Sequence, residues 1–503
     1  MAASKRKMPK SGRNDTFRSL PVKRSKISEG KATKPSPGST KEVSNATPSK
    51  LLDVHVCGYG DRDELDPRQS VRVTQAHLNK ILDTETDGVV DIASGGMHVA
   101  ALTRGNRILT WGFNASCARG RNPARKQGHK AKGAGDSYAD NPCGYESAAI
   151  TGYQFPPETK IVSLSAADNA TWALTEDGLV YGWGSYVMWD GKPGFYFNSM
   201  NEHVAGDSNP ILIPGLKNII QICAGANFCL ALDNNGKVYS WGRGDQSQLG
   251  RRLVVSRADS TRHSTMSIET LRTNMCFVPG IVPLPKAKKI VSIHAGSDHA
   301  FAIDSEGNTW AWGLNNFGQT GITAGVGIEG QGGTVAFPKK VPSLTGKNMK
   351  MLVGGSCHSV GITHSGECLV WGRLDGRWCG FHGSPTDDPK KVFHDGKKCI
   401  LLEPTPLFHS GCTDASAGAY HNLLVRDNSK VYSWGLNSSR QCSQSPNEYI
   451  RVPTLIGSES IRGKKISRIG VGAQHSIIAL AREDVEIDEA PAKTLRIKVE
   501  SSD

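Results

Sequence analysis

The sequence predicts an all-β fold, a seven-bladed β-propeller in which a strand near the N-terminus completes the last blade. Two observations predict it: a repeat that occurs six times in full, and two half-repeats at opposite ends that complement each other. The 56 glycines among 503 residues fit a chain of tight turns and short strands. We expect the propeller to span residues 51–482, between a basic tail at 1–50 and a loose tail at 483–503.

The N-terminal tail comes first in the chain and carries most of the excess positive charge. Residues 1–50 hold 13 lysines and arginines against three acidic residues, while the whole chain has a net charge of +13. With so few bulky apolar side chains, this tail cannot bury enough surface to offset its ordering entropy, and we expect it to be disordered. Its basic clusters predict a nuclear localisation signal that a nuclear import receptor would bind, formed by Lys5, Arg6, Lys7, Lys23, Arg24 and Lys26.

The six full repeats follow a common pattern with a period of roughly 55–70 residues, which suits a four-stranded blade with long loops. Each contains an apolar strand, small residues with glycine, a second apolar strand, a turn and an alternating strand that ends in Trp-Gly. Turns such as Asp177-Gly178 and Glu306-Gly307 are typical of hairpins. The copies end at Gly112, Gly184, Gly242, Gly313, Gly372 and Gly435.

The two half-repeats predict how the ring closes. The seventh copy, RIGVGAQHSIIALA, stops before its Trp-Gly strand. The missing piece is LLDVHVCGYG, Leu51 to Gly60, an alternating strand with Cys57-Gly58 in place of Trp-Gly. If Leu51–Gly60 pairs with the segment around Ile477, no long sheet edge is left exposed.

Several repeated residues that resemble functional motifs have a simpler structural interpretation. The tryptophans of Trp-Gly predict packing between blades, and a histidine that recurs in GxxH segments is usually a core or inter-blade hydrogen-bond partner. The 12 cysteines lack paired spacing and predict reduced core thiols. No apolar run reaches 18 residues and no secretory signal is present, so we expect no membrane association.

The motifs of covalent catalysis are missing from the sequence. It has no nucleophile elbow, no HExxH and no phosphate-binding loop of the GxxxxGK[ST] type. We therefore expect neither an enzyme of covalent chemistry nor a cofactor or metal.

Two segments go beyond the generic repeat: SWGRGDQSQLGRR, Ser240 to Arg252, and KIVSIHAGSDHAFAIDSEGNTWAWGLNNFGQTGI, Lys289 to Ile322. With them the chain resembles the fungal members of the regulator-of-chromosome-condensation family, over about residues 51–482. That resemblance implies a guanine-nucleotide exchange factor that promotes GDP release from the small GTPase Ran on chromatin. It would act in the nucleus, generating Ran-GTP for nucleocytoplasmic transport and mitosis.

The resemblance also implies which residues contact the GTPase. By motif position these are Asp61, His98, Asp168, Asn227, Arg251, His358 and His475. The loop after the second Trp-Gly lies where the family carries a short hairpin, the wedge, that enters the GTPase. In this chain it consists of Tyr186, Val187, Met188, Trp189, Asp190, Gly191, Lys192, Pro193 and Gly194.

A second set of implied contacts concerns chromatin. Two basic inserts are candidates for the histone H2A–H2B acidic patch and nucleosomal DNA, because arginine suits carboxylate clusters and phosphates. Their residues are Arg119 and Arg121 in the first insert, and Arg252, Arg257 and Arg262 in the second. The inserts hold few aromatic residues, so we expect them to contact phosphates and acidic side chains without reading the base sequence. We also expect the protein to be a monomer.

Two other functions remain open from the sequence. One is a non-catalytic propeller scaffold that binds chromatin or a regulatory partner; eroded Leu-Gly endings at Glu64–Asp66 and Gln441–Ser443, and an asparagine at 227, favour it. The other is a propeller hydrolase or lyase with a metal in its central channel, for which the histidines are the sole support.

Overall fold

The computed structural model describes residues 45–60, 65, 72–79, 82, 88–113, 118–119, 149–150, 155–187, 193–197, 203–204, 207–253, 275–285, 288–327, 333–375, 378–381, 392–395, 398–444 and 446–482. The chain divides into two units, residues 1–41 and 42–503, and all described residues belong to the second. Within the described part of that unit, no helix is long and apolar enough to cross a membrane.

The first three blades are antiparallel sheets built from consecutive segments of the chain. Blade 1 contains β3 (Val89–Ser94), β4 (His98–Thr103), β5 (Ile108–Gly112) and β6 (Ala149–Ile150). Blade 2 contains β7 (Ile161–Ala166), β8 (Ala170–Thr175), β9 (Val180–Gly184) and β14 (Asp207–Leu212). Blade 3 contains β15 (Ile219–Ala224), β16 (Phe228–Asp233), β17 (Val238–Gly242) and β18 (Gly280–Ile281).

The next three blades repeat this order. Blade 4 contains β19 (Ile290–Ala295), β20 (His299–Asp304), β21 (Thr309–Leu314) and β22 (Thr334–Lys340). Blade 5 contains β23 (Met349–Gly354), β24 (His358–Thr363), β25 (Cys368–Arg373), β27 (Lys398–Phe408) and the additional β26 (Val392–Asp395). Blade 6 contains β28 (Cys412–Ala417), β29 (His421–Arg426), β30 (Lys430–Leu436) and β31 (Tyr449–Leu455).

Blade 7 joins the two ends of the described chain. It contains β32 (Ile466–Val471), β33 (His475–Ala481), β1 (Leu52–Tyr59) and β2 (Arg72–Leu78). Outside the blades lie two small hairpins and a 3-10 turn: β10 (Tyr186–Val187) with β11 (Pro193–Gly194), β12 (Tyr196–Phe197) with β13 (His203–Val204), and η4 (Pro342–Leu344).

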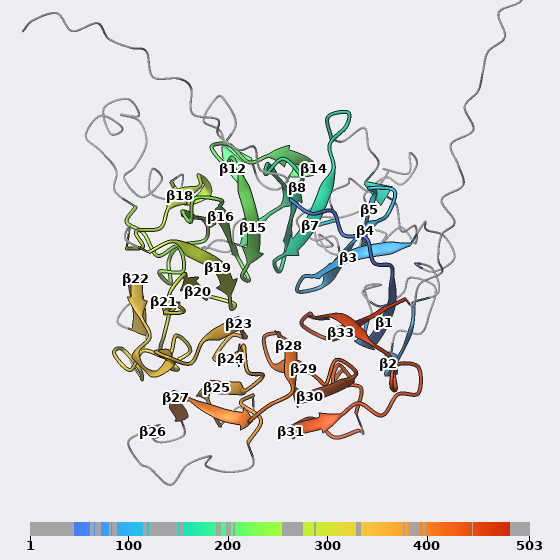
Figure 1. The fold of residues 1–503 in the computed structure, drawn as a ribbon, viewed down its shortest axis with the longest axis vertical. Coiled ribbons are helices and arrows are strands. Elements are labelled where there is room, and N and C mark those ends of the chain that lie inside the picture. Colours follow the sequence, from blue (N-terminus) through green and yellow to red (C-terminus); the bar gives the residue numbers. More distant parts are fainter. Residues whose placement is uncertain are drawn as a thin grey trace, which may run out of the picture. The chain divides into compact units, whose positions relative to one another are not determined.

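The blades form a closed ring. Their first strands contact one another in a cycle that runs β3, β7, β15, β19, β23, β28, β32 and back to β3. Figure 1 shows these strands around a common centre, with the colours advancing once around the ring. The predicted seven-bladed, all-β propeller is therefore confirmed.

The predicted closure of the last blade is also confirmed. β1 pairs with β33 along its whole length, in a register that places Val56 opposite Ile477. Gly58 has a φ of 125°, and a Cβ there would lie 2.3 Å from the Gln474 carbonyl oxygen. A Cβ added at Gly184 of blade 2 would likewise lie 2.3 Å from the Asn169 carbonyl oxygen. Cys57-Gly58 thus takes the place of Trp-Gly, because only glycine fits where the third strand passes this turn.

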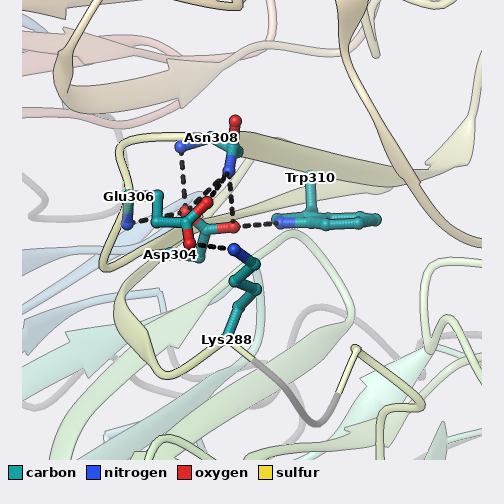
Figure 2. A network of polar contacts seen from close by, with 5 residues as sticks. All are labelled: Lys288, Asp304, Glu306, Asn308 and Trp310. Atoms are coloured by element: carbon teal, nitrogen blue, oxygen red, sulfur yellow. Dashed lines mark hydrogen bonds and ion pairs between the residues drawn. The ribbon is translucent and has the colours of Figure 1, made fainter.

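Two faces of the ring can be defined from the strand ends. We call the front face the one where each first strand ends and each second strand begins; on the back face, each second strand ends and each third begins. A back-face turn in blade 4 shows why these hairpins form (Figure 2). The Asp304 carboxylate accepts hydrogen bonds from the backbone N–H groups of Glu306 and Asn308 and from Trp310 Nε1, at 2.9–3.0 Å. Lys288 pairs with Glu306 beside it.

Residues 45–51, which we call the strap, precede β1, and the strap is held on the back face between blades 2 and 3. Asn45 donates from its backbone N–H to the Glu176 carbonyl at 2.8 Å. Its Nδ2 donates to the carbonyls of Thr175 at 3.0 Å and Ile219 at 2.9 Å. One side chain therefore bridges the end of β8 and the start of β15 before the chain reaches blade 7.

Candidate functional site

The front face gathers two kinds of loop from every blade. Its turns between first and second strands are Gly95–Met97, Ala167–Asn169, Gly225–Asn227, Gly296–Asp298, Gly355–Cys357, Gly418–Tyr420 and Gly472–Gln474. The residue after Trp-Gly, or after Cys-Gly in blade 7, donates its backbone N–H to the turn of its own blade, as when Ser185 N–H donates to the Asn169 carbonyl at 2.8 Å. The chain that follows Trp-Gly therefore starts beside these turns, and the predicted contacts Asp168 and Asn227 lie in them.

A series of backbone hydrogen bonds joins these turns around the ring axis. Each runs in the same sense, from an N–H of one blade to a carbonyl of the next. The six are Gly96 to Ala167, Asp168 to Ala226, Ala226 to Ser297, Ser297 to Gly355, Ser356 to Ala419 and Ala473 to Gly96. A Cβ at Gly355 would lie 2.3 Å from the Gly418 carbonyl oxygen, so a side chain would push the blades apart. We call these joined turns the rim. Because hydrogen bonds and close contacts link them from blade to blade, the rim is rigid before any partner binds.

The rim surrounds an axial cavity of about 440 Å³. Backbone and small side chains from all seven blades line most of it, and two carboxylates, Asp168 and Asp298, stand at its border. In the described part of the chain, no group of three or more histidine, cysteine or acidic side chains could hold a metal ion. The cavity therefore offers no support for a metal-dependent hydrolase or lyase.

Asp168 is the candidate residue best placed to meet a partner. Its side chain is exposed, and it makes no side-chain hydrogen bond or ion pair with any described residue. The loops around it displace water, and this desolvation, together with the negative charge of Asp298, raises the pKa of the Asp168 carboxyl to about 6. A basic group of a partner would stabilise the charged form, so Asp168 is poised to bind one.

The histidines of the GxxH segments lie between blades. Each second strand that begins with histidine presents a fully buried ring. His98 Nε2 lies 2.8 Å from Thr171 Oγ1, and His358 Nε2 lies 2.7 Å from Asn422 Oδ1, in the next blade in both cases. His475 Nε2 lies 2.9 Å from Ser94 Oγ, which links blade 7 to blade 1. Burial lowers the pKa of His98, His358 and His475 to about 4.

These bonds belong to a repeated latch between blades. In blades 4 and 5, His299 Nε2 donates to Ser359 Oγ at 2.7 Å, and that hydroxyl donates to the Gln319 carbonyl at 2.7 Å. The same carbonyl accepts from Trp371 Nε1 at 2.9 Å. The Trp-Gly tryptophans thus pack between blades, in line with the structural interpretation. Because the predicted contact residues His98, His358 and His475 are buried in this way, they cannot touch a partner directly.

The base of the wedge is fixed to the rim. β10 and β11 pair as a two-stranded hairpin, with Val187 opposite Pro193. Asn227 Oδ1 accepts from the Val187 N–H at 2.9 Å. Tyr186 is buried and stacks on Trp172 at 5.7 Å and Phe195 at 5.6 Å, so it anchors the hairpin and offers no exposed contact. Asn227 therefore holds the start of this hairpin against the front-face turn of blade 3.

The predicted arginines have three different environments. Arg251 is committed to the fold, because its guanidinium donates to Ser240 Oγ and to the carbonyls of Met275 and Val278 at 2.9–3.2 Å. Arg252 is exposed, with its guanidinium 5.6 Å from the centre of the Phe337 ring. Arg119 is 3% exposed, which is too buried for the chromatin contact predicted there.

The other predicted residues lie outside the described residues. For the GTPase contact these are Asp61 and the wedge residues Met188, Trp189, Asp190, Gly191 and Lys192. For chromatin they are Arg121, Arg257 and Arg262. The whole predicted nuclear localisation signal, Lys5, Arg6, Lys7, Lys23, Arg24 and Lys26, also lies there.

The comparison with protein families decides the relationship. The family model described as the RCC1-like domain matches residues 53–478, which is most of the chain. The chain belongs to the RCC1-like domain family.

The relatives of this RCC1-like chain include yeast proteins of known type. It is 34% identical to the protein pim1 of Schizosaccharomyces pombe over 91% of this chain and 80% of the relative. It is 30% identical to the guanine nucleotide exchange factor SRM1 of Saccharomyces cerevisiae, over 86% of this chain and 89% of the relative.

Two solved structures are similar to this chain. One is Prp20p from Saccharomyces cerevisiae, described with its binding properties to Gsp1p and histones: the TM-score is 0.73 at 28% identity, over 88% of this chain and 94% of that one. Yeast RCC1 bound to Kap60 gives a TM-score of 0.74 at 28% identity, over 92% of this chain and 97% of that one.

Sequence reasoning missed Asp298. It occupies the same turn position in blade 4 that Asn227 occupies in blade 3, so the repeat alignment could have indicated it. Its Oδ1 accepts from Gln248 Nε2 at 3.3 Å, and desolvation raises its pKa. Asp298 thus adds a second carboxylate to the rim, in blade 4, so that Asn227 of blade 3 lies between it and Asp168 of blade 2.

Proposed function

We propose that this protein is a guanine-nucleotide exchange factor that promotes GDP release from a Ran-type small GTPase. The observation that carries the proposal is the front-face rim, where the exposed Asp168 stands beside a wedge held by Asn227. Membership of a family with a named yeast exchange factor supports the same activity. No covalent chemistry is required of the propeller.

The proposed mechanism is differential binding. A GTPase holds its nucleotide through a phosphate-binding loop and Mg²⁺. A protein that binds the nucleotide-free form more tightly than the loaded form lowers the affinity for nucleotide by the same factor. The rim is already rigid, so little free energy is lost in ordering it. The wedge would displace the phosphate-binding loop, and Asp168 would repel phosphate and bind the basic side chain that phosphate releases.

We also propose a nuclear, chromatin-associated location. Prp20p, a structural relative, is described with its binding to histones, and yeast RCC1 with Kap60. In this chain the basic tail at 1–50 would carry the import signal and add salt-dependent affinity for DNA. Exposed Arg252, with Arg257 and Arg262, would meet a histone acidic patch. Retention on chromatin would place Ran-GTP formation in the nucleus.

A GDP-release assay tests the exchange activity. The full chain would be added to Ran-type, Rab-type and Rho-type GTPases loaded with a fluorescent GDP analogue. We expect faster release from the Ran-type GTPase alone. Release from none of the three would contradict the proposal and favour the non-catalytic scaffold.

A further inference from the structure

A second surface on the front face lies across the axial cavity from the wedge. Asp168 and Asn227 belong to blades 2 and 3, whereas this surface belongs to blades 4, 5 and 6. We call it the aromatic ladder, and its members are Phe317, Arg373, Trp378 and Tyr420.

The ladder is a row of contacting side chains, in which the Trp378 and Tyr420 rings are tilted by 40° to each other. The Arg373 guanidinium lies 4.8 Å from the centre of the Phe317 ring and 5.2 Å from that of Trp378. Trp378 lies 5.4 Å from Tyr420, centre to centre. Tyr420 is 43% exposed and ends the row beside Ala419, which lines the cavity. The planar groups are fixed before binding, which limits the entropy lost when a partner packs on them.

Trp378 departs from the pattern that blades 3, 4 and 6 follow at this position. Gln319 and Trp378 are equivalent, because each gives its carbonyl to the Trp-Gly indole of the next blade, at 2.9 and 2.7 Å. Where this position is glutamine, the side chain also caps its own turn. Gln248, Gln319 and Gln441 Oε1 accept from the backbone N–H two residues earlier at 2.8–2.9 Å. Blade 5 gives up this cap for an indole.

Inside the fold, the Trp378 indole contacts Arg373, Tyr420 and His358 but gains no hydrogen bond among the described residues. Trp172 and Trp241 also have a buried Nε1 without a partner among the described residues, but their rings are fully buried in the core, whereas Trp378 is partly exposed on the front face. Tryptophan, tyrosine and arginine are the residues most enriched where binding energy concentrates.

The pairing of the Arg373 charge indicates which kind of partner the ladder suits. Arg373 donates from Nη2 to Asp375 Oδ2 at 2.7 Å and from Nε to the same oxygen at 2.9 Å. Its charge is therefore already paired, so the ladder does not suit phosphates or a histone acidic patch. A protein surface with apolar side chains fits it better. The GTPase proposed to bind the wedge would reach it along the same rim.

We propose that the aromatic ladder is a second anchor for the GTPase, opposite the wedge. This inference rests on the proposed exchange activity. The wedge side would displace the nucleotide, while the ladder would hold an apolar part of the GTPase surface and supply affinity.

The test uses Trp378→Gln, which introduces the glutamine found in blades 3, 4 and 6 and keeps the backbone carbonyl. We expect binding to nucleotide-free Ran-type GTPase to weaken about 10-fold or more, with an unchanged melting temperature. Tyr420→Ala, at an exposed position, should weaken binding in the same direction and remains informative if Trp378→Gln fails to fold.

A matched control exists in the same molecule. Near the back-face end of blade 6, the Arg426 guanidinium lies 4.5 Å from the Phe408 ring centre and 5.8 Å from that of Tyr432. Tyr432→Ala removes a ring of the same kind and should leave binding unchanged. If the wild-type chain releases GDP but Trp378→Gln and Tyr420→Ala bind as tightly as it does, the ladder inference fails and exchange stands. If the wild-type chain is itself inactive, the proposed function fails, and the inference with it.

Discussion

At the scale of single residues, the front face separates side chains that build the ring from those that can meet a partner. His358 and Asp168 were predicted as contacts by the same resemblance. His358 is enclosed and bonded to Asn422, whereas Asp168 is exposed and makes no side-chain bond with a described residue. The sequence could place both residues at the front face but could not show which one pointed outward. That depends on how the next blade packs against each turn.

The first prediction contrasts these two residues. Asp168→Asn should slow GDP release about 10-fold or more, because a charged hydrogen bond to the GTPase contributes about 1.5–3 kcal/mol. The fold should not suffer. A carboxyl whose pKa is raised in the folded state contributes stability that is fully present below its unfolded pKa and is lost as pH rises through its folded pKa, here about 6. Asp168→Asn should therefore melt no lower than the wild-type chain at pH 7.5, which a thermal melt checks.

His358→Ala serves as the opposite case. It leaves Asn422 Oδ1 buried without its donor, and we expect it to cost about 1–3 kcal/mol of unfolding free energy. GDP release per folded molecule should stay within about twofold of the wild-type rate. A slower rate with an unchanged melting temperature would instead give His358 the contact role first predicted for it.

At the scale of elements, the sequence was informative wherever the repeat was regular. It predicted the pairing of Leu51–Gly60 with the segment around Ile477, because the two half-repeats complete one another. It could not predict the Asn45 strap. That contact depends on carbonyls of blades 2 and 3, whose spacing no local pattern encodes.

The second prediction concerns the closing strand. A chain lacking residues 1–60 loses β1 together with its buried Val54 and Val56, and leaves β33 as an open edge. We expect it to aggregate or to melt far below the full chain. A chain lacking residues 1–44 keeps both the strap and β1, and should melt as the full chain does. Equal melting temperatures for the two truncations, with monomers in both by light scattering, would contradict the role of β1.

At the scale of the whole molecule, the ring owes its stiffness to contacts repeated between neighbouring blades. The backbone bonds around the rim and the latches built on His98, His299, His358 and His421 all cross from one blade to the next. A disc joined in this way presents a fixed front face to the GTPase that we propose as its partner. It also holds the strap on the back face, away from the wedge.

The same latches should make the ring sensitive to acid. Burial lowers the pKa of the latch histidines to between about 3 and about 4, against an ordinary value of 6.5. A group with a depressed pKa contributes stability that is present above its unfolded pKa and is lost as pH falls toward the folded pKa. Each such histidine weakens the fold by up to about 1.4 kcal/mol per pH unit below 6.5.

Some carboxyls act in the opposite sense. Desolvation raises the pKa of Asp168 and Asp414 to about 6 and also raises that of Asp91 and Asp298, so acidification relieves their destabilisation. Depressed histidines are more numerous than these raised carboxyls: His55, His98, His294, His299, His358, His421 and His475. The balance therefore favours unfolding as pH falls.

The third prediction is that the melting temperature stays nearly level from pH 8 to pH 7 and falls steeply below about 6.5. Thermal melts at half-unit intervals from pH 8 to pH 4.5 measure it. His299→Gln keeps a side-chain N–H that can donate to Ser359 but does not titrate, so its melting temperature should fall less steeply over the acid range. A flat profile through pH 5, or an unaltered slope in His299→Gln, would mean that the buried latches are not what limits the stability of the ring in acid.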